Sequence, residues 1–185
     1  MSNPTLDIIM NRRSHRKYKP EQLTQQQLQA LIDAALQSPS AVNRQPWHFS
    51  VVQDPVLAKR ISDASHKVAA GLPEGKRSPR FNDPAFHVFY HAPTVFMISS
   101  PKEGGSPLDC GIAAQSIVLA AESMGLGCVM VALSGLAFQG EEADALRRDL
   151  QFPEGYDQVI AVAVGHADDT KPAHDMDRSK VSILR

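Results

Sequence analysis

The sequence has 185 residues, of which 43% are hydrophobic and 21% are charged, and its formal net charge is −1. This length and apolar share suit one compact domain, and the nearly balanced charge excludes a general attraction to nucleic acid or to an anionic membrane. The chain begins without the apolar segment of a signal peptide, and its apolar runs are far shorter than the roughly 20 residues that span a bilayer. We therefore expect a cytoplasmic protein that forms a single domain over residues 1–185, with residues 166–185 as an extended tail.

Elements in the first half of the chain follow from a capping pattern and from apolar spacing. Thr24 and Gln27 form a capping box, and the apolar residues that follow recur at the three- and four-residue spacing of a helix. Pro39 stops this helix, because proline disfavours helical backbone in the residue before it. The expected elements are a short apolar helix near residues 6–10, a helix over 24–37, a strand over 47–53 and a helix over 56–70.

The second half begins with a loop, residues 71–83, that is dense in glycine, proline and charge. Pro84 favours the first turn of a short helix, and the β-branched apolar run from Thr94 is typical of a buried strand. The segment 108–124 is apolar nearly all round, which predicts a helix buried in the core or at a subunit interface. The remaining predictions are a helix over 84–90, strands over 94–100, 128–133 and 156–165, and a helix over 139–150.

Together these elements predict an α/β or α+β sandwich around one central sheet. Cys110 and Cys128 lie in apolar segments without the spacing of zinc ligands, so we expect buried, reduced thiols and no metal site. No GxGxxG follows a strand and no GxxxxGK[ST] is present, which argues against a Rossmann dinucleotide site and a P-loop. The stretch ALSG, residues 132–135, lacks the two glycines of a nucleophile elbow, which argues against a serine hydrolase.

Four cations stand close together at Arg12, Arg13, Arg16 and Lys17. Basic residues at the end of a first helix can simply be solvated and favour the helix dipole. However, arginine side chains can grip a phosphate through two parallel hydrogen bonds, and Ser14 adds a hydroxyl donor beside them. The cluster is therefore a candidate site for a phosphomonoester.

A second candidate is the segment SPSAVNRQPWHF, residues 38–49. It is either an ordinary connector between a helix and a strand, with Asn43 and Gln45 bonded to loop backbone, or part of a binding site. Side-chain amides beside an aromatic strand start suit a planar heterocycle whose edge alternates donors and acceptors. The residues alone leave both interpretations open.

Four motifs follow one another along nearly the whole chain: RRSxRxY from Arg12, SPSxxNxQPWHF from Ser38, FYHAPTVF from Phe89 and DCGIAAQSIVLAAESMGLG from Asp109. In this combination the sequence resembles the FMN-dependent nitroreductase family. The resemblance implies an α+β three-layer sandwich whose central, mostly antiparallel sheet is flanked by helices. It also implies an intertwined homodimer with two FMN sites at the interface, and ping-pong electron transfer from NADH or NADPH to a small acceptor such as a nitroaromatic or a quinone.

The resemblance assigns cofactor contacts residue by residue and, because the flavin carries the redox chemistry, no catalytic side chain. The first motif would hold the FMN phosphate and ribityl chain and, through Arg16, the pyrimidine edge. The second would reach the flavin bound mainly by the partner subunit, backbone after the third strand would lie beside the ring, and a basic pair in the tail would close on the phosphate. The residues are Arg12, Arg13, Ser14 and Arg16, then Pro39, Ser40, Ala41, Asn43 and Gln45, then Leu133, Ser134 and Gly135, and last Arg178 and Lys180.

Three features depart from the family pattern. VALSG, residues 131–135, stands where one branch has proline, glutamate and glycine, so the residue that contacts flavin N5 is open. Asn82 is the nearest counterpart of an asparagine that often touches the pyrimidine. The chain is also short, with only the loop 71–83 where larger members carry helices over the active site, which leaves open the acceptor and the choice between NADH and NADPH.

Other functions share the same residues. A non-catalytic FMN-binding or storage protein would use the same contacts, and a specialised flavin reductase or dehalogenase would share the fold. A small anion-binding or nucleic-acid-binding module is disfavoured by the nearly neutral charge and by the lack of aromatic residues interleaved with basic ones.

Overall fold

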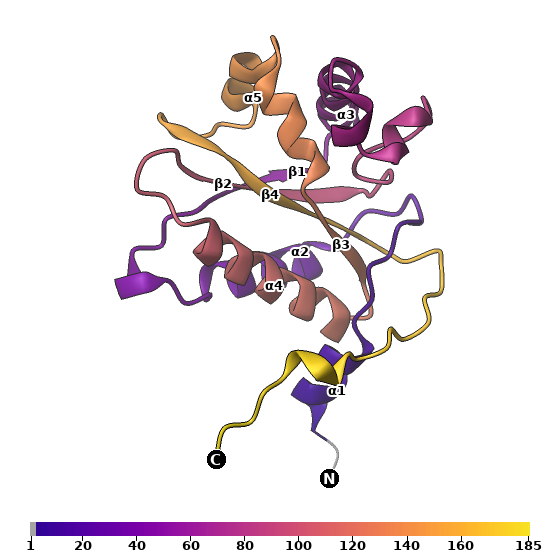
Figure 1. Ribbon diagram of the computed structural model, residues 1–185, viewed down its shortest axis with the longest axis vertical. Coiled ribbons are helices and arrows are strands. Elements are labelled where there is room, and N and C mark those ends of the chain that lie inside the picture. Colours follow the sequence, from indigo (N-terminus) through magenta and orange to yellow (C-terminus); the bar gives the residue numbers. More distant parts are fainter. Residues whose placement is uncertain (1–2) are drawn as a thin grey trace.

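A four-stranded antiparallel sheet lies at the centre of the computed structural model, which describes residues 3–185 (Figure 1). Its strand order is β1-β2-β4-β3, so that β3 and β1 form the two edges. All three pairs of neighbouring strands are antiparallel. Their bounds are β1 His48–Val52, β2 Thr94–Pro101, β3 Gly127–Val131 and β4 Tyr156–Gly165.

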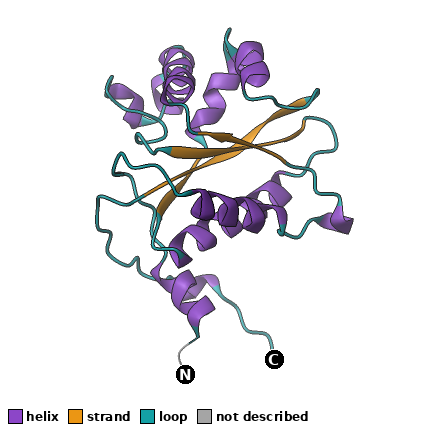
Figure 2. Cartoon of the chain, turned by 180° about the vertical axis from the view of Figure 1, so that it is seen from behind, coloured by secondary structure: helices purple, strands orange, loops and turns teal. Residues whose placement is uncertain are grey.

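Helices cover both faces of the sheet (Figures 1 and 2). On one face lie α1 (Pro4–Asn11), α2 (Gln25–Leu36) and α4 (Pro107–Ser123). On the other lie α3 (Pro55–Ala70), the 3₁₀ segment η4 (Leu133–Gln139) and α5 (Ala143–Asp149). The fold is therefore the α+β three-layer sandwich that the sequence predicts.

Two hydrophobic cores result, one on each face, because successive side chains of a strand point to opposite sides. In β2, Phe96 and Ile98 are buried in the core with α2 and α4, whereas Val95 and Met97 are buried in the core with α3 and η4. A strand covered on both faces needs a continuous apolar run rather than an alternating one, and TVFMISS supplies that run.

Several sequence predictions are confirmed. Thr24 caps α2, and the reciprocal bonds with Gln27 complete the capping box. Cys110 and Cys128 are buried and unpaired, and burial is the main cause that raises the pKa of the Cys128 thiol to about 12. Such a thiol stays protonated at neutral pH. Within the described part of the chain, no helix has both the length and the apolar character that crossing a membrane requires.

The predicted helix over 84–90 is wrong, because the structure forms consecutive turns there. Asp83 accepts a hydrogen bond from the Ala85 backbone, a local bond that competes with a helix, and Tyr90 and His91 have left-handed backbone with φ of 56° and 57°. The preceding loop also contains two short 3₁₀ segments, η2 (Glu74–Lys76) and η3 (Pro79–Asn82).

Two predicted boundaries also move. The predicted strand over 128–133 ends at Val131, and the predicted helix over 139–150 begins only at Ala143. Between them the chain forms η4, and Gly140 then takes an extended conformation with φ of −103° and ψ of −173°. An extended residue interrupts helical backbone, so α5 starts after it.

The tail, residues 166–185, runs from the end of β4 past α1, as Figure 1 shows in yellow. Ala167 forms an antiparallel bridge with Tyr18, and a last 3₁₀ turn, η5, covers Arg178–Lys180. The tail therefore returns to the segment that carries the Arg cluster.

Candidate functional site

The Arg cluster lies along edge strand β3. Ser14 forms a parallel bridge with Cys128, and the His15 backbone donates to the Cys128 carbonyl at 3.0 Å. Gly127 permits this approach, since a Cβ there would lie 2.8 Å from Ala167 Cβ and 3.1 Å from His15 Cβ. The N-terminal segment and the tail thus both pack against the start of β3.

Backbone hydrogen bonds join the tail to the cluster. Lys19 donates to the carbonyl of His166, and Asp168 donates to the carbonyl of Lys17, both at 2.9 Å. Asp169 adds side-chain contacts, with Oδ1 at 2.6 Å from His15 Nδ1 and Oδ2 at 3.2 Å from the Arg16 backbone nitrogen. Two segments more than 150 positions apart in the chain are thereby fixed side by side.

Asp169 is a charged anchor of this arrangement. Burial by itself would raise the pKa of its carboxyl, but hydrogen bonds from His15, from the Arg16 backbone and from Lys171 outweigh burial and lower it. A carboxyl whose pKa is lower in the fold contributes stability above its unfolded pKa of about 3.9, and that contribution is lost as pH falls through the folded value.

We expect Asp169→Asn to loosen the tail, because the amide cannot form the charged contacts with His15 and Lys171. Limited proteolysis at pH 7 should then cleave residues 166–185 faster than in the wild type. Asp168→Asn is the matched control, since Asp168 is held through its backbone. Equal cleavage rates of wild type and Asp169→Asn would show that Asp169 does not anchor the tail.

The arginines of the cluster differ in what they contact. Arg13 uses its guanidinium within the chain, donating to the carbonyls of Met10, Arg12 and Pro172, so it also ties the tail down. Arg12 forms no hydrogen bond or ion pair through its side chain within residues 3–185. Of Arg12 and Arg13, only Arg12 therefore has a guanidinium that is free, among the described residues, to bind a ligand.

Arg16 has a guanidinium whose hydrogen bonds are only partly satisfied within the described chain. Its Nη1 donates to the Ser14 carbonyl at 3.3 Å, whereas its Nε is buried and has no hydrogen-bond partner among the described residues. An unpaired buried donor is costly, so an acceptor from a bound molecule would stabilise it. This orphaned donor fits an oxygen or ring nitrogen at the pyrimidine edge of a flavin.

The second predicted group, Pro39 to Gln45, does not lie with the Arg cluster. It connects α2 to β1 and projects from the edge of the molecule, away from α1, in both views (Figures 1 and 2). Val42, Asn43 and Gln45 have left-handed backbone with φ of 47°, 54° and 48°, and Val42 is 90% exposed. Strained, protruding loops of this kind are concentrated at functional sites and interfaces.

The Pro39 to Gln45 loop is held by its own polar groups. The Gln45 backbone donates to Ser40 Oγ at 2.9 Å, and Gln45 Nε2 donates to Asn43 Oδ1 at 3.1 Å. Within one chain this loop contacts none of the other predicted cofactor residues by a hydrogen bond or ion pair between described residues. Within one chain the loop and the Arg cluster are therefore separate groups, with no direct polar contact between their described residues.

The third predicted group, Leu133 to Gly135, follows β3 directly. Ser134 is buried, and its hydroxyl donates to the Val131 carbonyl and accepts from Gln158 Nε2. Its side chain is therefore committed to the protein. Leu133 and Gly135 line a cavity of about 380 Å³ together with Lys76 and Arg77 of the 71–83 loop.

Arg178 and Lys180 lie in η5, which overlaps α1 in the view of Figure 1. Both are exposed, and Asp177 caps this turn by accepting from the Ser179 backbone at 3.0 Å. Asn82, the possible pyrimidine contact, accepts instead from Arg77 Nη2 at 2.7 Å and is exposed. Among the described residues, neither the tail cations nor Asn82 forms a hydrogen bond or ion pair with the Arg cluster.

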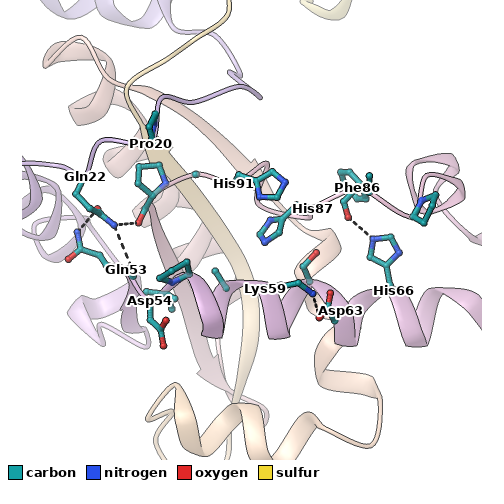
Figure 3. A pocket seen from close by; sticks show the side chains of 18 of the residues that line it. Pro20, Gln22, Gln53, Asp54, Lys59, Asp63, His66, Phe86, His87 and His91 are labelled. Carbon is teal, nitrogen blue, oxygen red and sulfur yellow. Dashed lines mark hydrogen bonds and ion pairs between the residues drawn. The ribbon is translucent and has the colours of Figure 1, made fainter.

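A cavity of about 930 Å³ lies elsewhere in the molecule (Figure 3). It lies over α3, and none of the predicted cofactor residues lines it. His87 and His91 stand side by side there with ring centroids 4.4 Å apart, and burial is the main cause that lowers the pKa of His87 to about 4. The two residues have His-x-x-x-His spacing in the sequence, a spacing for which no site is predicted above.

Comparisons with known proteins bear on the site just described. The model of the Nitroreductase family matches residues 9–166. The chain belongs to the nitroreductase family. A putative NADH dehydrogenase/NAD(P)H nitroreductase of Archaeoglobus fulgidus is 30% identical over 177 residues, covering 93% of this chain and 90% of the relative.

Solved structures of nitroreductases share the fold over the full length of the chain. A nitroreductase with bound FMN from Desulfitobacterium hafniense has a TM-score of 0.93 and 36% identity, with 100% of both chains covered. An FMN-dependent nitroreductase from Clostridium difficile has a TM-score of 0.77 and 30% identity, also with 100% of both chains covered. The family is therefore shown by sequence and by structure.

Proposed function

We propose that this nitroreductase-family protein is an FMN-dependent oxidoreductase that passes electrons from NADH or NADPH to a small acceptor, such as a nitroaromatic or a quinone, by a ping-pong mechanism. The observation that carries the proposal is the buried, unpaired Arg16 Nε beside the available Arg12 at the edge of β3. Full-length similarity to a nitroreductase with bound FMN supports the same cofactor. A cytoplasmic location is part of the proposal.

The phosphate end of the site is formed by cations from both ends of the chain. Arg12 and Ser14 come from the N-terminal segment, and Arg178 and Lys180 come from the tail that Asp169 and Arg13 tie to it. A phosphomonoester carries a charge of about −1.5 to −2 at neutral pH, and each charge-assisted hydrogen bond contributes about 1.5–3 kcal/mol. These contacts bind and orient the cofactor without taking part in electron transfer.

Arg16 would act on the ring. When bound, FMN supplies the two-electron chemistry, and the chain supplies orientation and field. A guanidinium at the pyrimidine edge stabilises the negative charge that gathers there on reduction, in a partly buried place where the interaction is stronger than in water. Arg16 would therefore make reduction by a nicotinamide more favourable.

Backbone after β3 would lie beside the ring. Because the Ser134 hydroxyl is bonded to Val131 and Gln158, a contact from this stretch to the flavin would come from main-chain groups of Leu133, Ser134 or Gly135. A Cβ on Gly135 would lie 2.9 Å from Gln158 Oε1, so a glycine suits this close approach. The cavity shared with Lys76 and Arg77 leaves room next to this backbone.

A homodimer would complete the site. Pro39, Ser40, Ala41, Asn43 and Gln45 project away from their own Arg cluster, so we propose that they reach the flavin held by the partner subunit. Large apolar side chains are exposed on α1 and the tail, and a partner would bury them. They are Leu6, Ile9, Met10, Val181, Ile183 and Leu184.

Anaerobic reduction tests the proposal. The purified protein should be yellow with releasable FMN, and stoichiometric NADH or NADPH should bleach the flavin absorbance. A nitroaromatic or quinone added afterwards should restore the absorbance in a separate step, as a ping-pong mechanism requires. A yellow protein that neither nicotinamide reduces would favour the storage alternative, and a colourless protein that FMN does not bind would contradict the proposal.

A further inference from the structure

Tyr90 contacts two arginines from different parts of the chain, Arg16 of the Arg cluster and Arg80 of the 71–83 loop. The carbon at the centre of the Arg16 guanidinium is 5.9 Å from the centroid of its ring, and that of Arg80 is 5.7 Å away. The Arg16 distance lies just within the limit of about 6 Å for a cation–π contact, whereas Arg80 meets the hydroxyl end of the ring. Arg80 also donates a hydrogen bond through Nη1 to the Tyr90 hydroxyl.

The backbone holds Tyr90 in an unusual conformation to make these contacts. Tyr90 and His91 are consecutive non-glycine residues in the left-handed region, with φ of 56° and 57°. Each such residue costs of the order of 1–3 kcal/mol, and the cost persists only where surrounding contacts fix the geometry. Phe86 provides one of them, packing edge-on at 5.6 Å between centroids.

Arg16 has few other contacts that could fix its guanidinium. Its side chain forms no ion pair with a described carboxylate, its Nη1 bond to the Ser14 carbonyl is 3.3 Å long, and its Nε has no partner in residues 3–185. Asp169 contacts the Arg16 backbone rather than the guanidinium. The Tyr90 ring is thus one of two recorded contacts of the charged group among the described residues, the other being the Ser14 carbonyl.

We propose that Tyr90 is the positioning residue for Arg16, with Arg80 holding the Tyr90 hydroxyl from the 71–83 loop. The proposal rests on the proposed function, which places Arg16 at the pyrimidine edge of FMN. The ring orients the Arg16 guanidinium without supplying a carboxylate, so the positive charge stays available to the flavin. A carboxylate partner in the same place would neutralise the field that favours reduced flavin.

The flavin midpoint potential measures this role. Tyr90→Leu removes both the ring and the hydroxyl, so Arg16 loses its orientation, and the preference for reduced over oxidised flavin should fall about tenfold. For a two-electron couple this is a shift of about 30 mV to more negative values. Tyr90→Phe keeps the ring and loses only the Arg80 bond, so its potential should shift in the same direction but by less than that of Tyr90→Leu.

Tyr156→Leu is the matched control, because Tyr156 is a partly buried tyrosine at the start of β4, at the other end of the strand from the bridge to Tyr18. Its potential should equal that of the wild type. Dye-coupled anaerobic titration of the three variants and the wild type gives the four potentials. An unchanged potential in Tyr90→Leu, or an equal shift in Tyr156→Leu, would overturn the proposal.

A flavin-free measurement separates this proposal from the proposed function. In ¹H–¹⁵N spectra of the full-length apoprotein, the Arg16 Nε–H signal, assigned by its loss in Arg16→Lys, should be shifted by the Tyr90 ring current and should move in Tyr90→Leu. A signal at the free-arginine position in the wild type would overturn the positioning role even if FMN binds. If the signal is shifted but FMN does not bind, the contact stands while the proposed function and the role at the flavin both fall.

Discussion

Arg12→Ala should weaken FMN binding about 10- to 150-fold, the largest effect on the cofactor that we expect from a single side chain. The range follows from the loss of one charge-assisted hydrogen bond to the phosphate, worth about 1.5–3 kcal/mol. Arg12 is expected to matter more than Arg13, because the Arg13 guanidinium is bonded to protein carbonyls. Fluorescence titration of FMN into the apoprotein gives the dissociation constant.

Arg148→Ala is the control for charge alone. Arg148 is an exposed arginine in α5, on the opposite face of the sheet from α1. Its removal changes the net charge by the same amount and should leave FMN affinity unchanged. If Arg12→Ala and Arg148→Ala bind FMN equally well, Arg12 does not contact the phosphate.

Gly127→Ala should have the largest effect on the fold, without removing any polar group. A Cβ at this position would meet Ala167 Cβ at 2.8 Å and His15 Cβ at 3.1 Å, and neither atom belongs to a flexible side-chain end. The tail and the N-terminal segment must then separate from β3, at a cost of about 1–3 kcal/mol. Thermal unfolding should therefore occur roughly 2–12 °C lower, and FMN affinity should fall with it.

Gly71→Ala is the matched control for Gly127→Ala. Gly71 has right-handed backbone at the end of α3, and a Cβ there would meet the Val68 carbonyl oxygen at 3.6 Å, an ordinary contact distance. Its melting temperature should stay near that of the wild type. A Gly127→Ala protein that melts at the wild-type temperature would show that the three segments are not packed as described.

The sequence predicts best those elements whose signals are local. Thr24 and Gln27 predict the start of α2 because the capping box needs four consecutive positions, and the buried run from Thr94 predicts a strand covered on both faces. The turns at 84–91 escape prediction, since Pro84 is equally suited to a turn and the left-handed Tyr90 contacts Arg16, which lies far away in the sequence. Local propensity gives no sign of such contacts.

Local sequence signals also fail to predict how the parts of the candidate site come together. Motif spacing predicts which stretches contribute, and the structure brings the tail to the Arg cluster through Asp169, a residue with no motif signal. Tyr90 lies inside the FYHAPTVF motif, yet its contact with Arg16 depends on tertiary structure. The loop from Pro39 to Gln45 points away from the cluster of its own chain, and its proposed place in the site of a partner subunit rests on the family resemblance rather than on a contact within one chain.

The central claim is that cations from both ends of one chain and the Pro39 to Gln45 loop of another form each FMN site. Native mass spectrometry of the purified protein tests it most directly, because it reports the number of chains and the number of cofactors in one particle. We predict a dimer that carries two FMN molecules in the wild type, and a smaller fraction of fully loaded dimer in Gly127→Ala at the same FMN concentration. A monomer that keeps FMN, or a dimer that binds none when FMN is supplied in excess, would contradict the account.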